Sequence, residues 1–151
     1  MVFDDVGRHV AQAGGFDRAA VPLGMYLAWL ANHQLLSAAF SERAATLITR
    51  LRFREITGSE LLVAGCGGVL DAAHLSPEGE AFTTRYFPGF YAEFRREFGA
   101  DPYAVEDDWD HYDRMARRLT GAFMAFRGRR AAPAGQTSRG QWLWNRLKFW
   151  R

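Results

Sequence analysis

The sequence lacks a pair of cysteines for a disulfide, a long apolar run and a secretory signal. It contains one cysteine, Cys66, so it cannot form an intramolecular disulfide. No stretch approaches the roughly 18 consecutive apolar residues that a membrane-spanning helix needs. The N-terminus, Met1 to Asp5, is acidic and lacks the basic start and apolar stretch of a secretory signal. We therefore expect a cytoplasmic protein.

Acidic residues are missing from the last part of the chain. Residues 128–151 hold five arginines and one lysine without an acid, a charge of +6. Residues 1–127 hold 13 arginines and all 17 acids, a charge of −4. A body that binds nucleic acid normally needs a basic face. The acidic body therefore argues against specific nucleic-acid binding.

Sustained β alternation is also missing, whereas apolar residues at helical spacing are frequent. With 151 residues, of which 48% are hydrophobic, the chain can form one domain with its own core. We predict an all-α fold, a compact bundle of about five helices with a flexible basic C-terminal tail that contains a short amphipathic helix. The predicted parts are a helical domain (1–127), a linker (128–140) and a basic, Trp-rich tail helix (141–151).

Two helices are expected in the first third of the chain, after an irregular N-terminus over residues 1–20. Pro22 lies in the first turn of a helix over residues 21–37, where its missing N–H costs nothing. Apolar residues at helical spacing predict a second helix over residues 41–55.

Capping signals mark the later helices. Thr57 and Glu60 have the spacing of a capping box. Ser76 precedes a proline and an acid, which is typical of a helix start, and Pro88-Gly89 should interrupt the helix that follows. The clearest helix covers residues 109–126, where large apolar side chains recur at intervals of three and four.

No pattern of catalytic or metal-binding residues stands out. Cys66 lies among glycines that would let a substrate approach its sulfur, but a lone cysteine is commonly a small buried hydrophobe. Asp107 and Asp108 lie four and three residues before His111, without an HExxH motif or a cysteine pair beside them. An acidic helix start explains the same residues through the helix dipole. We predict no catalytic residue, no metal and no cofactor.

Acids crowd the start of the last helix and form the candidate partner-binding site, which consists of Glu106, Asp107, Asp108 and Asp110. Successive positions at one helix start point in different directions, so they suit acid–base catalysis poorly. They suit capture of a basic protein, because complementary charge raises the association rate and sets the orientation.

The tail has three open interpretations, which share the same candidate contacts: Trp142, Trp144, Arg146, Lys148 and Trp150. Tryptophan with basic residues suits a membrane surface. The tail can also bind an acidic partner or nucleic acid, or fold back on the acidic body. Because 11 residues are short for an autonomous helix in water, a docking surface is expected.

Five short segments of the sequence together carry a resemblance to a known family: Phe3-Asp4-Asp5 with His9, Leu23-Gly24-Met25-Tyr26-Leu27-Ala28-Trp29, Ile56-Thr57-Gly58, Leu75-Ser76-Pro77-Glu78-Gly79, and Val105-Glu106-Asp107-Asp108-Trp109. They resemble a family of small, uncharacterised bacterial proteins, a domain of unknown function. That family typically opens with Tyr-Asp-Asp-Ala-x-Trp-His, and here Phe3, Val6 and Arg8 replace the Tyr, Ala and Trp. The resemblance implies a fold but no catalytic residues. By analogy, such proteins are similar to immunity proteins.

Three functional hypotheses follow. The leading one is a non-enzymatic protein-binding protein, an immunity protein that neutralises a cognate bacterial toxin. The second is a small-ligand-binding protein or enzyme with a pocket near Asp4, Asp5, His9 and Trp29. The third is a membrane-peripheral adaptor anchored by the tail.

Overall fold

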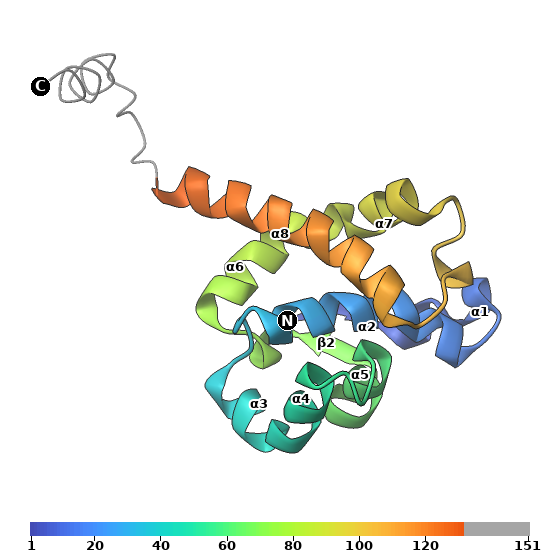
Figure 1. Ribbon diagram of the computed structural model, residues 1–151, viewed down its shortest axis with the longest axis horizontal. Helices are drawn as coiled ribbons and strands as arrows, with labels where there is room; N and C mark the ends of the chain where they lie inside the picture. The colour runs from blue at the N-terminus through green and yellow to red at the C-terminus, as the bar shows by residue number, and fades with distance from the viewer. Residues whose placement is uncertain (132–151) are drawn as a thin grey trace, which may run out of the picture.

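A computed structural model describes residues 1–131, which form a mostly helical body with one small sheet (Figure 1). The predicted fold class is confirmed. The elements are β1 (Val2–Asp5), η1 (Val6–Arg8), α1 (Val10–Ala13), α2 (Phe16–Asn32), α3 (Ala38–Arg43), α4 (Ala45–Arg52), α5 (Gly58–Cys66), β2 (Val69–Asp71), η2 (Ala72–His74), α6 (Pro77–Tyr86), η3 (Phe87–Gly89), α7 (Phe90–Phe98), η4 (Pro102–Ala104) and α8 (Trp109–Ala131), where η denotes a 3₁₀ turn.

The α2 helix is the centre of the core. Every residue from Ala19 to Ala31 is buried, because α2 runs between α8 on one side and α3 to α5 on the other (Figure 1). A helix that is apolar on all sides is expected in such a position. The expectation of a helix start at residue 21 was wrong, since α2 begins at Phe16 and Pro22 lies inside it. Gly14, in the left-handed region at φ 78°, ends the short α1 and allows the chain to start α2 so early.

The closest backbone contact of the core joins α2 to α5 at two glycines. A Cβ atom on Gly24 would lie 2.5 Å from the backbone nitrogen of Ser59, and a Cβ atom on Gly58 would lie 2.0 Å from the carbonyl oxygen of Gly24. Neither glycine can carry a side chain without moving one helix. The capping box predicted at the start of α5 is present, with Thr57 accepting from the Glu60 amide and Glu60 accepting from the Thr57 amide.

The small sheet was not predicted. Strands β1 and β2 pair antiparallel, and the amide of Val6 donates to the carbonyl of Gly68 at 2.9 Å just beyond them. The strands have four and three residues, which is too short for alternation to show in the sequence. Their pairing fixes the N-terminal segment beside the end of α5.

Two further helical stretches are divided in the structure. The helix expected over residues 41–55 is instead α3 and α4, separated at Ala44, whose backbone leaves the helical region at ψ 20°. The interruption predicted at Pro88-Gly89 is confirmed as the turn η3 between α6 and α7. The helix start at Ser76 is confirmed too, because its hydroxyl accepts from the amide of Gly79 at 3.0 Å.

The last helix, α8, starts where the sequence predicts and runs to Ala131. It therefore includes the first four residues of the expected linker, 128–140. The remainder of that linker and the expected tail helix, 141–151, lie outside the described residues. Over residues 1–131, no helix is both long enough and apolar enough to cross a membrane.

We expect Gly24→Ala and Gly58→Ala to lower the free energy of unfolding by about 3 kcal/mol, because overpacking here meets backbone rather than a movable side chain. Gly121→Ala in α8 is the matched control: nothing lies within 4 Å of the added methyl group. Alanine is the better helix former, so the control should gain about 0.5–1 kcal/mol. Urea denaturation measures all three. Equal effects at Gly24 and Gly121 would contradict the tight contact.

Candidate functional site: an acidic cleft

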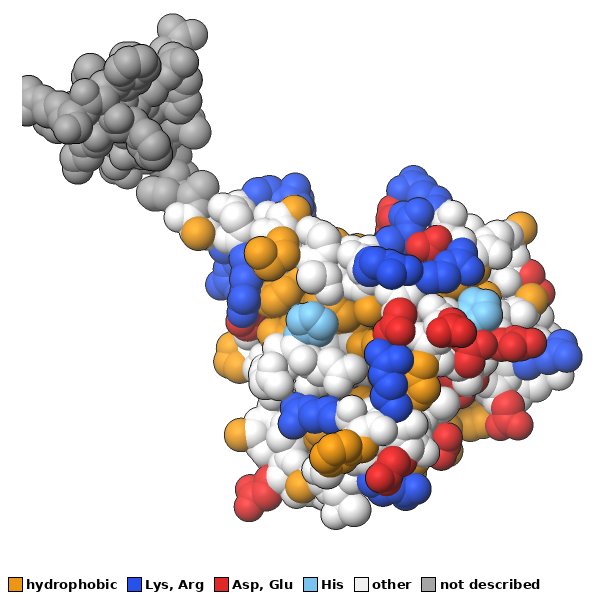
Figure 2. Space-filling model, in the orientation of Figure 1, with side chains coloured by type: hydrophobic (Ala, Val, Ile, Leu, Met, Phe, Trp, Pro, Cys, Tyr) orange, Lys and Arg blue, Asp and Glu red, His pale blue; other side chains and the backbone are white. Residues whose placement is uncertain are grey.

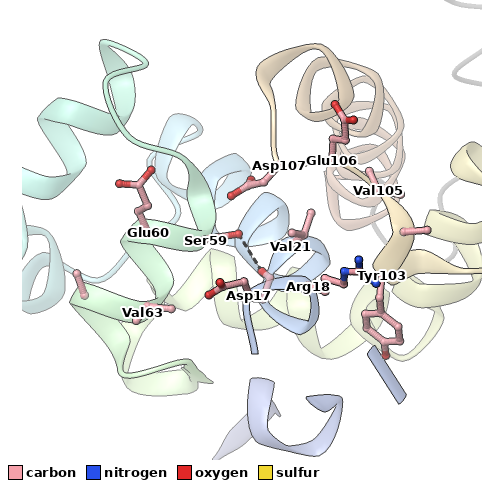
Figure 3. Close-up of a pocket in the computed structure, with 13 residues that line it drawn as sticks. Asp17, Arg18, Val21, Ser59, Glu60, Val63, Tyr103, Val105, Glu106 and Asp107 are labelled. Carbon is pink, nitrogen blue, oxygen red and sulfur yellow. Dashed lines mark hydrogen bonds between the residues drawn. The ribbon is translucent and has the colours of Figure 1, made fainter. Parts of the chain in front are cut away.

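A cleft of about 930 Å³ opens between the first half of α2, the helix α5 and the segment from η4 to α8 (Figure 3). Its apolar floor consists of Ala20, Val21, Val63 and Ala64. Four carboxylates surround the floor and a single arginine, Arg18, accompanies them. We call this site the acidic cleft and define it by Asp17, Glu60, Glu106 and Asp107.

The four carboxylates come from three separate segments. Asp17 lies in the first turn of α2, and Glu60 lies in the first turn of α5, where carboxylates are favoured by the helix dipole. Glu106 and Asp107 lie in the non-helical segment that precedes α8. In Figure 3, Asp17 and Asp107 point into the space between these segments, whereas Glu60 and Glu106 stand at its rim with their carboxylates directed outward. The four acids therefore surround one cleft from three segments instead of lying together at one helix end.

Within the part of the chain that the structure describes, none of the four carboxylates has an ion-pair partner. Ten ion pairs lie within 4.0 Å among residues 1–131, and none of them includes a cleft acid. The nearest polar contact is to a neutral group, since the Thr57 hydroxyl donates to Asp107 Oδ2 at 2.8 Å. The described part of the protein thus gathers four carboxylates and only one arginine, a net negative charge, around an apolar floor.

Asp107 has the most perturbed environment of the four. Partial desolvation against the cleft wall raises the pKa of its carboxyl, and the nearby charges of Glu60 and Asp108 raise it further, while the Thr57 hydrogen bond works in the opposite direction. One side of the residue is open to solvent. The ionised carboxylate is therefore held in a position where a cation would be more favourable than water.

The structure divides the four acids that the sequence indicated. Glu106 and Asp107 line the cleft, together with Asp17 and Glu60, which the sequence did not indicate. Asp108 instead caps the start of α8, where its carboxylate accepts from the His111 amide at 2.8 Å and contacts the His111 ring at 2.7 Å. Asp110 is exposed in the first turn of α8 and does not line the cleft.

A second polar group, the partly buried cluster of Asp4, His9, Tyr91 and Tyr103, lies behind one wall of the cleft. His9 Nε2 is 2.8 Å from Asp4 Oδ1, and His9 Nδ1 is 2.6 Å from the Tyr103 oxygen. The Tyr91 hydroxyl donates to Asp4 Oδ2 at 2.7 Å. Burial raises the pKa of both tyrosines, and Asp4 raises them further, so both phenols keep their protons.

These contacts fit one assignment of protons. In the tautomer with the proton on Nε2, the Tyr103 hydroxyl donates to His9 Nδ1, and His9 Nε2–H donates to a side-chain oxygen of Asp4. Asp4 is only 5% exposed and also accepts from the amide of Asp5 at 2.8 Å, so its buried side-chain oxygens are well satisfied. The cluster therefore acts as a clamp that ties β1 and η1 to α7 and η4.

The pocket expected from Asp4, Asp5, His9 and Trp29 does not form from these four residues. Asp4 and His9 meet, but the Asp5 carboxylate accepts from the amide of Gly7 at 2.8 Å. Trp29 is fully buried in the core, where its Nε1–H donates to Thr120 Oγ1 at 3.1 Å. The two tyrosines of the cluster were missed because they follow Asp4 and His9 by 87 and 94 residues.

The structure also bears on the two remaining candidates, Cys66 as a nucleophile and the acids near His111 as metal ligands. Cys66 is half-buried, and burial raises the pKa of its thiol to about 12, which suits a small hydrophobe and not a nucleophile. Over residues 1–131, no three His, Cys, Asp or Glu side chains are grouped so that they could hold a metal ion.

The fold and the site together define a mostly helical domain with an acidic cleft beside a partly buried polar clamp. A family model described as a domain of unknown function (DUF7832) matches residues 3–119, and the chain belongs to that family. This confirms the predicted membership of an uncharacterised family. The match includes every residue of the acidic cleft and of the clamp. No curated protein and no solved structure matches the chain.

The clamp predicts a stability effect at Tyr91. Tyr91→Phe removes a hydrogen bond to a buried carboxylate and should lower the free energy of unfolding by about 1.5–3 kcal/mol. Tyr86→Phe is the matched control, since the Tyr86 hydroxyl is buried without a partner among the described residues. Because this hydroxyl is buried and unsatisfied, its loss should leave the free energy of unfolding unchanged or raise it by up to about 3 kcal/mol. Urea titrations measure the free energy of unfolding of both variants. An equal loss in the two variants would contradict the clamp.

At Asp107, in contrast to Tyr91, we expect that removing the polar group's charge does not lower stability. Its raised pKa means that the ionised group favours the unfolded chain, so folding loses stability as the pH rises through the folded pKa. Asp107→Asn keeps an acceptor for Thr57 and should melt at or above the wild-type temperature at pH 7. The two proteins should converge below about pH 3, where carboxyls are protonated.

Asp110→Asn is the control for that experiment, because it removes a favourable charge from the first turn of α8. It should lower the melting temperature at pH 7. If Asp107→Asn is also destabilising at pH 7, the cleft does not hold Asp107 in an unfavourable environment.

Proposed function

We propose that the protein is a non-enzymatic binding protein whose acidic cleft captures a basic segment of another protein, and that this partner is a toxin that it neutralises. The observation that carries the proposal is the placement of four carboxylates from three segments around one apolar floor, without an ion-pair partner among residues 1–131. Immunity to a toxin is an analogy with other small binding proteins and goes beyond the family match.

The composition of the cleft suits lysine and arginine side chains. Their charged heads can reach carboxylates at the rim while their methylene stems lie on apolar surface. Val63, on the floor, is 43% exposed and is available for such contact. A cleft of about 930 Å³ is at the upper end of the range for ligand pockets and can receive several side chains at once.

Electrostatics favour a basic protein with a large charged surface. Acids that pair with no described residue, on a body with a net charge of −4, attract such a partner at long range and orient it. A toxin that acts on nucleic acid must itself carry a basic surface to hold phosphates. An acidic cleft that covers this surface would compete directly with the nucleic acid.

The same arrangement supports binding over catalysis. Among residues 1–131, the cleft lining has carboxylates but no histidine, cysteine or group of metal ligands. Tyr103 lines the cleft, yet its hydroxyl is directed to His9 and points away from the carboxylates (Figure 3). The adaptor hypothesis depends on the tail and stays a prediction, because the tail contacts lie outside the described residues.

Coexpression with the product of the neighbouring gene tests the proposal. We expect a stable complex on size-exclusion chromatography and protection of the host cell from the toxicity of that product. In calorimetry, Glu60→Gln and Glu106→Gln should each weaken binding about tenfold at low salt, and the affinity should fall as salt increases.

Asp110→Asn provides the matched control, because it removes one exposed acid outside the cleft. Its affinity should stay within about twofold of wild type. The proposal fails if no complex forms, and the cleft fails as the binding site if all three variants bind equally well.

A further inference from the structure

A second, basic groove lies between α6, η3 and α7 on one side and the C-terminal half of α8 on the other. Its volume is about 500 Å³. Four arginines line it, Arg85 from α6, Arg96 from α7, and Arg118 and Arg129 from α8, against one carboxylate, Glu93. Basic side chains gather on both sides of an indentation between α7 and α8 in Figure 2. We call this site the basic groove.

The four arginines differ in their partners. Glu93 pairs with both Arg96 and Arg118, and Arg118 also lies 3.5 Å from a carboxylate oxygen of Glu97. Arg85 and Arg129 have no carboxylate within 4.0 Å among residues 1–131. Two guanidinium groups, one from each wall, are therefore available to an anion.

Tyr86 adds an unused hydrogen-bond donor to the groove. Its hydroxyl is buried and has no partner among the described residues, which normally costs about 1–3 kcal/mol. The ring is held in place by stacking on Phe82 at a centroid distance of 5.1 Å. Burial and the charge of Glu93 raise the pKa of Tyr86 to about 12, so the hydroxyl stays protonated and can donate.

We propose that the basic groove binds the phosphate group of a small molecule between Arg85 and Arg129, and that the ligand displaces the side chains that close the Tyr86 hydroxyl from solvent and accepts its hydrogen bond. Guanidinium groups from two sides and a hydroxyl donor match an anion with several acceptor oxygens. The groove has the volume of a small-ligand pocket. The rest of the body is acidic, which disfavours a long polyanion such as nucleic acid.

The basic groove and the acidic cleft are at different ends of α8. The cleft adjoins the segment before α8, and the groove adjoins Ala122, Phe126 and Arg129. Phosphate binding therefore does not depend on the proposed capture of a basic partner, and either can fail without the other.

Calorimetry on the full chain at low salt, with inorganic phosphate, adenosine monophosphate and uncharged adenosine as probes, tests the proposal. We expect saturable binding of the phosphate-bearing probes and none of adenosine. Tighter binding of adenosine monophosphate than of inorganic phosphate identifies a phosphate monoester as the ligand, and equal binding identifies free phosphate. If neither probe binds, the proposal is wrong.

Variants assign the binding to the groove. Arg85→Gln with Arg129→Gln should weaken phosphate binding at least tenfold, and Tyr86→Phe should weaken it about fivefold while the melting temperature does not fall. Arg8→Gln with Arg117→Gln removes the same charge at exposed sites outside the groove and should retain the affinity. Equal affinity in both double variants would overturn the proposal, because binding would then reflect net charge alone.

Discussion

The approach of α2 to α5 at Gly24 and Gly58 is the constraint on which the rest of the structure depends. A methyl group at Gly58 would lie 2.0 Å from the Gly24 carbonyl oxygen, so the two backbones are in direct contact. This contact places the first turn of α5 against α2. The capping residue Thr57 and the rim residue Glu60 are positioned by that turn, and Thr57 in turn holds Asp107. The position of one wall of the acidic cleft is therefore set by the contact between Gly24 and Gly58 in the core.

The clamp positions the opposite wall. Asp4 and His9, at the N-terminus, hold Tyr91 of α7 and Tyr103 of η4 through hydrogen bonds of 2.6 to 2.9 Å. The segment that carries Glu106 and Asp107 continues directly from η4. With both walls fixed, Asp107 stays partly desolvated and subject to repulsion from Glu60, and both effects raise the pKa of its carboxyl. A cation that enters the cleft would relieve this repulsion, which is the physical basis of the proposed binding.

The sequence predicted correctly those helix starts and breaks that depend on residues close together in the chain. The capping residues Thr57 and Ser76, the break at Pro88-Gly89 and the apolar spacing of α8 are all readable within a few residues, and the structure has each of them. The start of α2 and the pairing of β1 with β2 were missed. Helix α2 is apolar on all sides, so periodicity does not mark its ends, and the strands are too short to alternate.

The sites were harder to predict than the fold, because they are built from distant residues. Asp17, Glu60 and Asp107 belong to three segments, and nothing in the sequence relates the first two to the third. An acid in the first turn of a helix is expected from the dipole alone, so Asp17 and Glu60 gave no distinct signal. The clamp is similar: the phrase Phe3-Asp4-Asp5 with His9 indicated two of its members, and the two tyrosines lie far along the chain.

Hydrogen–deuterium exchange with and without the product of the neighbouring gene tests the central claim, that the acidic cleft is the partner-binding surface. The amides in the three segments that form the cleft, residues 17–21, 59–64 and 103–107, are the ones that a bound partner would cover. We predict slower exchange in all three segments of the complex. Slower exchange confined to α3 and α4, or to the groove between α6 and the end of α8, would contradict the account.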